Sequence, residues 1–576
     1  MNPRQLEAIT APDGPLLITA GAGSGKAKTL TARLLYLIDK GVPAESIVAI
    51  TFTNKAAGEM KSRAEALLRS RGFKGFPFIG TFHSLSARFL RSEARFLGRE
   101  PSFSIYDDDD STKVVKNALK ALDIDKDKRS VSGLKNKISK VKNELLDPAD
   151  FAEEDARFFA VYRKYEEMLL EQNAFDFDDL IGKLAFLFET RPEVLSRYHD
   201  RFTHFLVDEY QDVNTAQYRL TSLLAARHRN LNVVGDDHQS IYSFRSADFR
   251  NFLNFEKDYP EAKIVTLDQN YRSTKTIIGA ASAVIAQNKY QRPKTLWTEN
   301  EDGEPIKVSR FPRADKEADW IADSILGESY DSTAILYRTN AQSRPIEQAL
   351  IFNRIPYAVF GGLKFYDRKE IKDIVAAMRL TANPKDGASA ERILKEFGKI
   401  RGRKLIEVLP QAASFTPTEL IGYVLKETDY ATALKKEFKN FEERMENLSE
   451  LIAFSNNFSS LQEMIERISL LESSDSPRGD EKNAVRLMTI HMAKGLEFDS
   501  VYLAGVDDGV LPHERSLLSA DDIEEERRLM YVAMTRARKK LRMSFWKAPS
   551  RFLFEMPPEL VDFDNFEFDD DTVYLS

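Results

Sequence analysis

The chain has 576 residues, of which 43% are hydrophobic and 30% are charged, so it is long and apolar enough to bury several hydrophobic cores. Its 83 basic and 90 acidic side chains give a formal charge of −7. Net charge therefore offers no support for a nucleic-acid partner, and any nucleic-acid path has to be a local basic track. The absence of cysteine excludes disulfides, thiolate metal sites and cysteine nucleophiles.

The first residues, MNPRQLEAI, lack the basic stretch followed by an apolar stretch that marks an export signal. We find no apolar run of about 18 residues, the length that a membrane-spanning helix needs. These observations predict a soluble, unexported protein without a membrane partner, and the lack of cysteine is compatible with the cytoplasm.

The first ninety residues alternate short apolar runs with amphipathic helices, which is typical of strand–helix–strand units in a parallel sheet. From residue 89 to residue 187 the pattern is almost wholly helical, and strand-like runs then return at THFLVDEY, LNVVGDD and AKIVTLDQN. We therefore predict a first α/β core from residues 1–88 and 188–268, with a helical insert at 89–187.

A second α/β core is predicted from residues 269–379 and 480–550, with strands at STAILYRT, AVRLMTIH, SVYLAGV and LRMSFW. Residues 380–479 between its two parts have a helical pattern and form a second, short insert. The remaining residues, 551–576, are rich in carboxylates, which predicts a disordered acidic tail. A partner-docking or DNA-mimicking segment is the alternative interpretation of this tail.

A glycine-rich segment, AGAGSGK at 20–26, lies between a predicted strand and a predicted helix. In this context backbone N–H groups can close around a β-phosphate and Lys26 can reach the β- and γ-oxygens; a tight glycine turn that serves packing alone is the alternative. The next position normally carries Ser or Thr, whose hydroxyl holds Mg²⁺, but here it is Ala27. The predicted nucleotide contacts of this segment are Gly21, Ala22, Gly23, Ser24, Gly25, Lys26 and Ala27.

Two adjacent carboxylates, Asp208 and Glu209, follow the predicted strand at 204–207. This arrangement is expected where the first carboxylate holds Mg²⁺ and the second polarises the attacking water. An acidic pair at a strand end is by itself an ordinary helix-start signal, so the prediction depends on the partnership with Lys26.

Nine segments, in sequence order, resemble the signatures of the UvrD/Rep/PcrA helicases of superfamily 1. They are NPRQ at 2–5, ITFTNKAAGEM at 50–60, GTFHSLSARFL at 80–90, DEYQD at 208–212, GDDHQSIYSFRSAD at 235–248, QNYRST at 269–274, IPYAVFGGLKFYDRKEIKD at 355–373, TIHMAKGLEF at 489–498 and RLMYVAMTRAR at 528–538. The resemblance implies two RecA-like parallel-sheet cores with ATP and Mg²⁺ between them. It also implies ATP-driven 3′ to 5′ movement on single-stranded DNA, with unwinding at junctions between single and double strands, in DNA repair or replication.

The resemblance also implies roles for individual residues. Gln5 resembles the glutamine that reads the adenine edge, Lys28 and Tyr271 match positions that flank the adenine ring, and Glu497 matches a carboxylate near the ribose. The positions that resemble sensors or clamps of the γ-phosphate are Gln239, Arg272 and Arg536. The positions that match contacts to the single strand are Phe52, Phe82, His83, Tyr242, Phe244, Arg245, His491 and His513. For any one of these aromatic residues, an ordinary core position is the alternative.

Three departures from the family pattern narrow the expected activity. The second insert is short, and Gly398–Gly402 is at best a remnant of the loop that grips duplex backbone in other members, so translocation is a firmer expectation than strand separation. We expect no C-terminal barrel of the kind that binds RNA polymerase and no nuclease module. Finally, Ala27 favours a competing function, a nucleotide-dependent clamp or remodeller on single-stranded DNA with little turnover.

Overall fold

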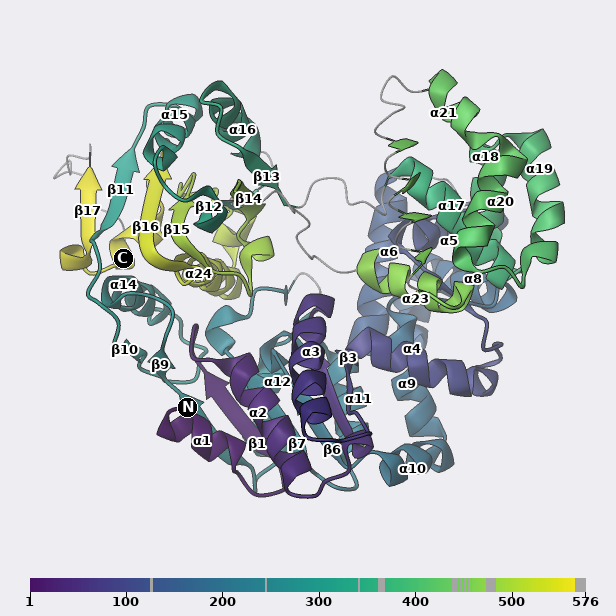
Figure 1. The fold of residues 1–576 in the computed structure, drawn as a ribbon, viewed down its shortest axis with the longest axis horizontal. Coiled ribbons are helices and arrows are strands. Elements are labelled where there is room, and N and C mark those ends of the chain that lie inside the picture. The colour runs from purple at the N-terminus through teal and green to yellow at the C-terminus, as the bar shows by residue number, and fades with distance from the viewer. Residues whose placement is uncertain are drawn as a thin grey trace.

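The computed structural model describes residues 1–124, 128–243, 246–339, 342–360, 368–437, 444–445, 448–449, 451–452, 455–456, 458–472 and 483–564. Two parallel sheets, each with helices packed against it, lie beside two groups of helices (Figure 1). No helix in these ranges is long and apolar enough to span a bilayer. The fold is α/β, with two RecA-like cores that are each interrupted by a mainly helical insert.

The first sheet has six parallel strands in the order β3-β2-β6-β7-β1-β8. Its central strands are buried along their whole length, which explains why their sequences are continuous apolar runs rather than alternating ones. The strands are β1 (Leu16–Ala20), β2 (Ile47–Thr51), β3 (Phe78–Thr81), β6 (His204–Val207), β7 (Leu231–Gly235) and β8 (Lys263–Leu267). The helices that pack on them are α1 (Pro3–Ile9), α2 (Lys26–Asp39), α3 (Asn54–Ser70), α11 (Thr215–Ala225), α12 (Arg250–Leu253) and α13 (Phe255–Asp258).

The second sheet has seven parallel strands in the order β13-β14-β12-β15-β16-β11-β17. They are β11 (Ile306–Arg310), β12 (Thr333–Tyr337), β13 (Tyr357–Val359), β14 (Val485–Thr489), β15 (Phe498–Leu503), β16 (Ala537–Phe545) and β17 (Val561–Asp564). Its helices are α14 (Lys275–Ile285), α15 (Ala314–Ile325), α16 (Ser343–Phe352) and α24 (Ala520–Met534). A short parallel pair, β9 (Gln269–Asn270) and β10 (Trp297–Thr298), lies where the chain passes from the first core to the second.

The predicted acidic tail begins too early. Residues 561–564 form β17, which pairs in parallel with β11 at the edge of the second sheet, and Phe552 and Leu553 are buried in the core of that sheet. The acidic side chains of this strand alternate with Val561 and Phe563, which pack against the core. The prediction failed because a strand with one face in solvent has an acidic composition like that of a disordered tail. Residues 565–576 lie outside the described residues.

The first insert contains α4 (Phe82–Glu93), α5 (Asp108–Ala121), α6 (Lys128–Glu144), α7 (Phe151–Glu154), α8 (Ala156–Glu171), α9 (Asp179–Thr190) and α10 (Pro192–Arg201). It is not wholly helical, because β4 (Ser104–Tyr106) and β5 (Ala174–Asp176) form a parallel pair within it. The predicted boundaries at residues 88 and 187 fall inside α4 and α9, whose buried residues belong to the core of the first sheet. The insert therefore grows out of continuous helices rather than from loops.

The second insert contains α17 (Lys369–Ala382), α18 (Gly387–Glu396), α19 (Lys399–Val408), α20 (Pro417–Thr428), α21 (Tyr430–Glu437) and α23 (Leu461–Glu472). The predicted start at residue 380 is wrong, because α17 packs as a whole with these helices. This insert lies beside the first insert, on the right of Figure 1, and away from the sheet of its own core. Arg379 forms a buried ion pair with Asp110, and Asn383 Nδ2 donates to Ser104 Oγ at 2.8 Å.

Candidate active site and nucleic-acid interface

The glycine-rich segment forms the turn between β1 and α2. Gly23 and Gly25 have φ angles of 66° and 83°, which side chains with a Cβ rarely adopt, so the turn requires glycine at these two positions. The Ser24 hydroxyl donates to Gly21 O at 2.8 Å, and Gln5 Nε2 donates to Ser24 O at 2.9 Å. One hydrogen bond within the turn and one from α1 therefore fix the conformation of the turn, which leads directly into the first turn of α2.

A cavity of about 300 Å³ opens in front of this turn and is lined by residues of both cores, among them Lys26, Asp208, Glu209 and Arg272. Lys26 Nζ is buried and has no hydrogen-bond partner within the described ranges. Its nearest anion is Glu209 Oε2 at 3.6 Å, which is too long for a hydrogen bond. A buried ammonium group without a partner is costly, and phosphate oxygens would supply what it lacks.

Asp208 and Glu209 lie at the carboxyl end of β6, on the wall of this cavity. Burial and the charge of Glu209 raise the pKa of Asp208 to about 7. Burial acts in the same direction on Glu209, but the nearby charges of Lys26 and Lys494 outweigh it and lower the pKa of Glu209. Glu209 also has a positive φ of 50°, a strained conformation that a non-glycine residue keeps only where its surroundings enforce it.

Ala27 lies in the first turn of α2, exposed to the same cavity as Asp208. Its methyl group stands where a hydroxyl was expected. Thr29 does not replace it, because Thr29 is fully buried and its hydroxyl donates to Gly25 O at 3.1 Å. Among the described residues no group of three or more acidic or histidine side chains could hold a metal ion.

The second core contributes two arginines. Arg536 is buried, and its guanidinium donates to Gln239 Oε1 of the first core at 3.2 Å and to Leu496 O at 3.1 Å. Burial, reinforced by the charge of Arg272, lowers the pKa of Arg536 to about 9, so the group is still cationic at neutral pH. Arg272 Nε donates to Glu497 at 2.7 Å, which places this carboxylate beside the arginine that lines the cavity. The structure therefore brings together Gln239, Arg536, Arg272 and Glu497 at the junction of the two cores.

A wider cavity of about 890 Å³ adjoins the turn on the side of α1. Gln5, Lys28 and Tyr271, the positions that the resemblance assigns to the adenine, all line it, and Trp297 lines it as well. The carboxamide of Gln5 is already engaged, since its oxygen accepts from Asn2 N at 3.1 Å while its nitrogen holds Ser24 O. The Tyr271 hydroxyl donates to Gln269 Oε1 at 2.8 Å, which fixes the ring at the rim.

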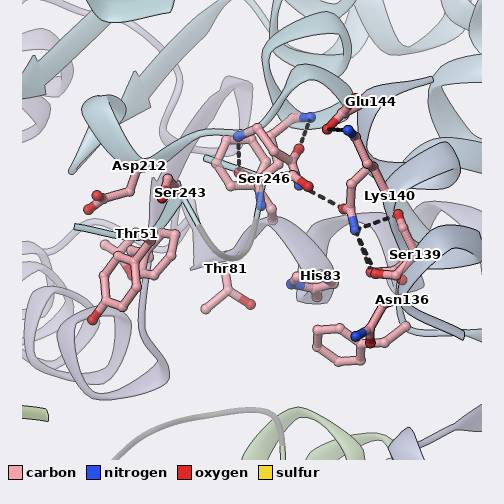
Figure 2. Close-up of a pocket in the computed structure, with 18 of the residues that line it drawn as sticks. Thr51, Thr81, His83, Asn136, Ser139, Lys140, Glu144, Asp212, Ser243 and Ser246 are labelled. Carbon is pink, nitrogen blue, oxygen red and sulfur yellow. Dashed lines mark hydrogen bonds and ion pairs between the residues drawn. The ribbon is translucent and has the colours of Figure 1, made fainter. Parts of the chain in front are cut away.

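A third cavity, of about 680 Å³, lies between the first core and α6 of the first insert (Figure 2). Phe52, Phe82, His83 and Tyr242 all line it. The rings of Phe52 and Tyr242 are stacked with centroids 5.3 Å apart, and those of His83 and Phe177 with centroids 3.8 Å apart. Burial lowers the pKa of His83 to about 3, so this ring is neutral and aromatic at physiological pH.

Figure 2 also shows polar residues of α6, namely Asn136, Ser139 and Lys140, on the opposite side of the cavity from Asp212. Aromatic faces surrounded by amide and hydroxyl groups are suited to nucleobases, which present both a π-face and hydrogen-bonding edges. This combination distinguishes the cavity from an ordinary aromatic core, in which such polar groups are rare.

Not every predicted strand contact reaches this cavity. His491 lies next to it, because its backbone oxygen accepts from the Tyr242 hydroxyl at 3.3 Å. His513 is not among the lining residues; it lies just before a short turn of helix in the second core, and its backbone N–H donates to Glu526. Phe244 and Arg245 lie outside the described residues.

Sequence reasoning missed three residues that connect the cavity in front of the glycine-rich turn with the cavity lined by Phe52 and Tyr242. All three lie in segments that carry the family resemblance. Gln211 and Asp212 come shortly after Glu209, and Lys494 belongs to the segment TIHMAKGLEF. Lys494 Nζ bonds to Asp212 and, at 2.6 Å, to Gln239 O. The last aspartate of DEYQD and the lone lysine of the later segment were the available signals.

Comparison with known proteins identifies the family. The UvrD/REP helicase N-terminal domain matches residues 1–260, and the UvrD-like helicase C-terminal domain matches residues 265–431 and 420–548. The chain belongs to the UvrD/Rep helicase family. Its relatives include proteins named ATP-dependent DNA helicase PcrA from Staphylococcus epidermidis and Bacillus subtilis. Each is 40% identical to this chain over 98% of its length, and the matches cover 87% and 86% of those relatives.

Proposed function

We propose that the chain is an ATP-dependent DNA helicase that moves 3′ to 5′ along single-stranded DNA and opens duplex at junctions. The observation that carries this function is a cavity that is lined by residues of both cores. Lys26 and the glycine-rich turn belong to the first core, whereas Arg272 and Arg536 belong to the second, and Arg536 already bonds to Gln239 across the junction. A γ-phosphate held from both sides would draw the cores together, and its release would let them separate.

Each residue then has a chemical task. Lys26 and the backbone of the turn bind the β- and γ-phosphates, and Glu209 orients the attacking water and accepts its proton. Arg272 and Arg536 stabilise the charge that develops on the transferred phosphoryl group. Mg²⁺ fits beside Asp208, a buried carboxylate on the cavity wall, and when bound it would neutralise charge on the phosphate oxygens. Because Ala27 offers no hydroxyl, Asp208, phosphate oxygens and water would hold the ion.

We place the single strand in the cavity between the first core and α6, which is lined by the stacked rings of Phe52 and Tyr242. Phe52 and Tyr242 offer a stack to bases of any sequence, and stacking of this kind is worth about 1–3 kcal/mol per base. The family relationship and the printed names of the relatives support DNA as the nucleic acid.

A second candidate is a clamp that grips and releases single-stranded DNA with little turnover, and Ala27 is the observation that favours it. Multiple-turnover ATP hydrolysis with and without an oligothymidylate separates the two. A helicase is stimulated by the oligonucleotide and separates duplexes with a 3′ single-stranded tail in preference to those with a 5′ tail. A clamp binds both ligands but hydrolyses little ATP.

A further inference from the structure

Lys494 comes from the second core but makes its contacts with the first. It follows the end of β14, and its side chain is only 7% exposed. Its Nζ donates to Asp212 Oδ2 and, at 2.6 Å, to the backbone oxygen of Gln239. The ammonium group of this second-core lysine is therefore bound by acceptors of the first core.

The same ammonium group touches both proposed sites. It lies 4.8 Å from the centroid of the Tyr242 ring, the ring that stacks on Phe52 in the strand cavity. Asp212, its partner, lines that cavity (Figure 2), while Lys494 itself lines the smaller cavity in front of the glycine-rich turn. A cation over an aromatic face is held by the ring's quadrupole, so the position of the lysine depends on the position of the ring.

From Asp212 a short chain of hydrogen bonds leads to the proposed general base. Gln211 Nε2 donates to Asp212 Oδ2 at 2.9 Å and also to Glu209 Oε2 at 2.7 Å. One amide group thus ties the carboxylate that Lys494 neutralises to the carboxylate that orients the attacking water. The other carboxylate oxygen of Asp212 is buried and has no hydrogen-bond partner in the described part of the chain. Within that part of the chain, Lys494 forms the ion pair with this carboxylate.

We propose that Lys494 is a positioning residue that transmits occupancy of the strand cavity to Glu209, through Asp212 and Gln211. This inference rests on the proposed function, in which Glu209 is the base and the strand lies against Tyr242. When bases fill the cavity and the cores are closed, Lys494 is seated and Gln211 holds Glu209 toward the water. When the cores part, Asp212 loses the ammonium group that pairs with it, and it competes with Glu209 for the amide of Gln211.

The inference is tested with Lys494→Met, which keeps the length of the side chain and removes its charge, and with Asp212→Asn. Lys539→Met is the matched control, because it removes the same charge from an exposed position of the second core. Three quantities are measured for each protein: ATP turnover with and without oligothymidylate, oligothymidylate affinity, and the affinity of a non-hydrolysable ATP analogue with and without the oligonucleotide. The last pair gives the coupling between the two sites without any hydrolysis.

In Lys494→Met and in Asp212→Asn we expect the stimulation by DNA, and the change in analogue affinity that DNA causes, to fall by about tenfold, within the usual range of coupling between sites. The double variant should be no worse than either single variant, because both changes break the same link. Lys494→Arg keeps the charge and should retain part of the stimulation, which a collapse of the fold would not allow. Lys539→Met should behave as the unmodified chain.

The possible failures are distinguishable. If the unmodified chain is not stimulated by DNA and shows no coupling, the proposed function itself is wrong. If the unmodified chain is stimulated and Lys494→Met is stimulated equally, only the role of Lys494 is wrong. Strictly additive losses in the double variant would overturn the path through Asp212.

Discussion

Substitution of Ala27 is the most direct test of the proposed nucleotide site. Ala27→Thr places a hydroxyl in the first turn of α2, facing the cavity that also contains Asp208. Because Ala27 is exposed to that cavity, the larger side chain displaces no packed neighbour, and the intrinsic helix cost of threonine is at most about 0.7 kcal/mol. Mg²⁺ prefers near-ideal octahedral geometry, so one additional fixed oxygen should hold it in place against the phosphates.

We expect Ala27→Thr to raise DNA-stimulated turnover by at least about tenfold, which corresponds to about 1.4 kcal/mol of the activation barrier. Nucleotide affinity should change little, because Lys26 and the backbone of the turn carry most of the phosphate binding. Ala27→Val is the matched control, since valine has the shape of threonine without its hydroxyl. Steady-state ATP hydrolysis over a range of Mg²⁺ concentrations, with saturating oligothymidylate, is the assay. Equal rates for the threonine and valine variants would refute the reasoning and show that the metal site is complete without this ligand.

Three further predictions concern other parts of the molecule. Phe52→Ala should weaken binding of oligothymidylate by about 1–3 kcal/mol in a titration at fixed salt, with nucleotide affinity nearly intact; equal loss of both would indicate a damaged core. Arg536→Ala should lower DNA-stimulated turnover by about 10³-fold or more, and a variant with normal stimulation would contradict the proposed clamp on the γ-phosphate. Burial raises the pKa of Glu317 from 4.5 to about 7 in the folded second core, so its contribution to stability is fully present below pH 4.5 and is lost as the pH rises through 7. The difference amounts to about 3 kcal/mol. Glu317→Gln keeps an acceptor for the backbone N–H of Gly505 and should therefore raise the thermal midpoint at pH 8 relative to the unmodified chain but not at pH 4.5; the same change at both pH values would contradict this.

The parallel cores could be predicted from sequence because buried strands have a simple signature. β1, β2, β6 and β7 are fully buried, so their sequences are short apolar runs that stand out between amphipathic helices. β17 was missed for the opposite reason. It lies at the sheet edge, where acidic residues alternate with apolar ones, and such a strand has the composition of a solvated tail.

The residue types of the proposed nucleotide site were also readable from sequence, because they depend on local geometry. A glycine-rich turn after a strand and an acidic pair after another strand each fix a residue type at a defined place in a parallel sheet. The absence of a hydroxyl at Ala27 is visible in the sequence as well. Thr29 lies two residues further along the helix and faces a different direction, and its hydroxyl is engaged by Gly25 O, so it does not compensate.

By itself, then, the sequence determined most of the order of strands and helices, the residues of the glycine-rich turn and the membership of a family, since each depends on neighbours along the chain. Only the tertiary structure decided which distant residues meet. Arg536 reaches Gln239, and Lys494 reaches Asp212, across a junction between cores that are separated by two inserts. Their pairing depends on how the two sheets pack, and packing between distant segments leaves no periodic pattern in a single sequence.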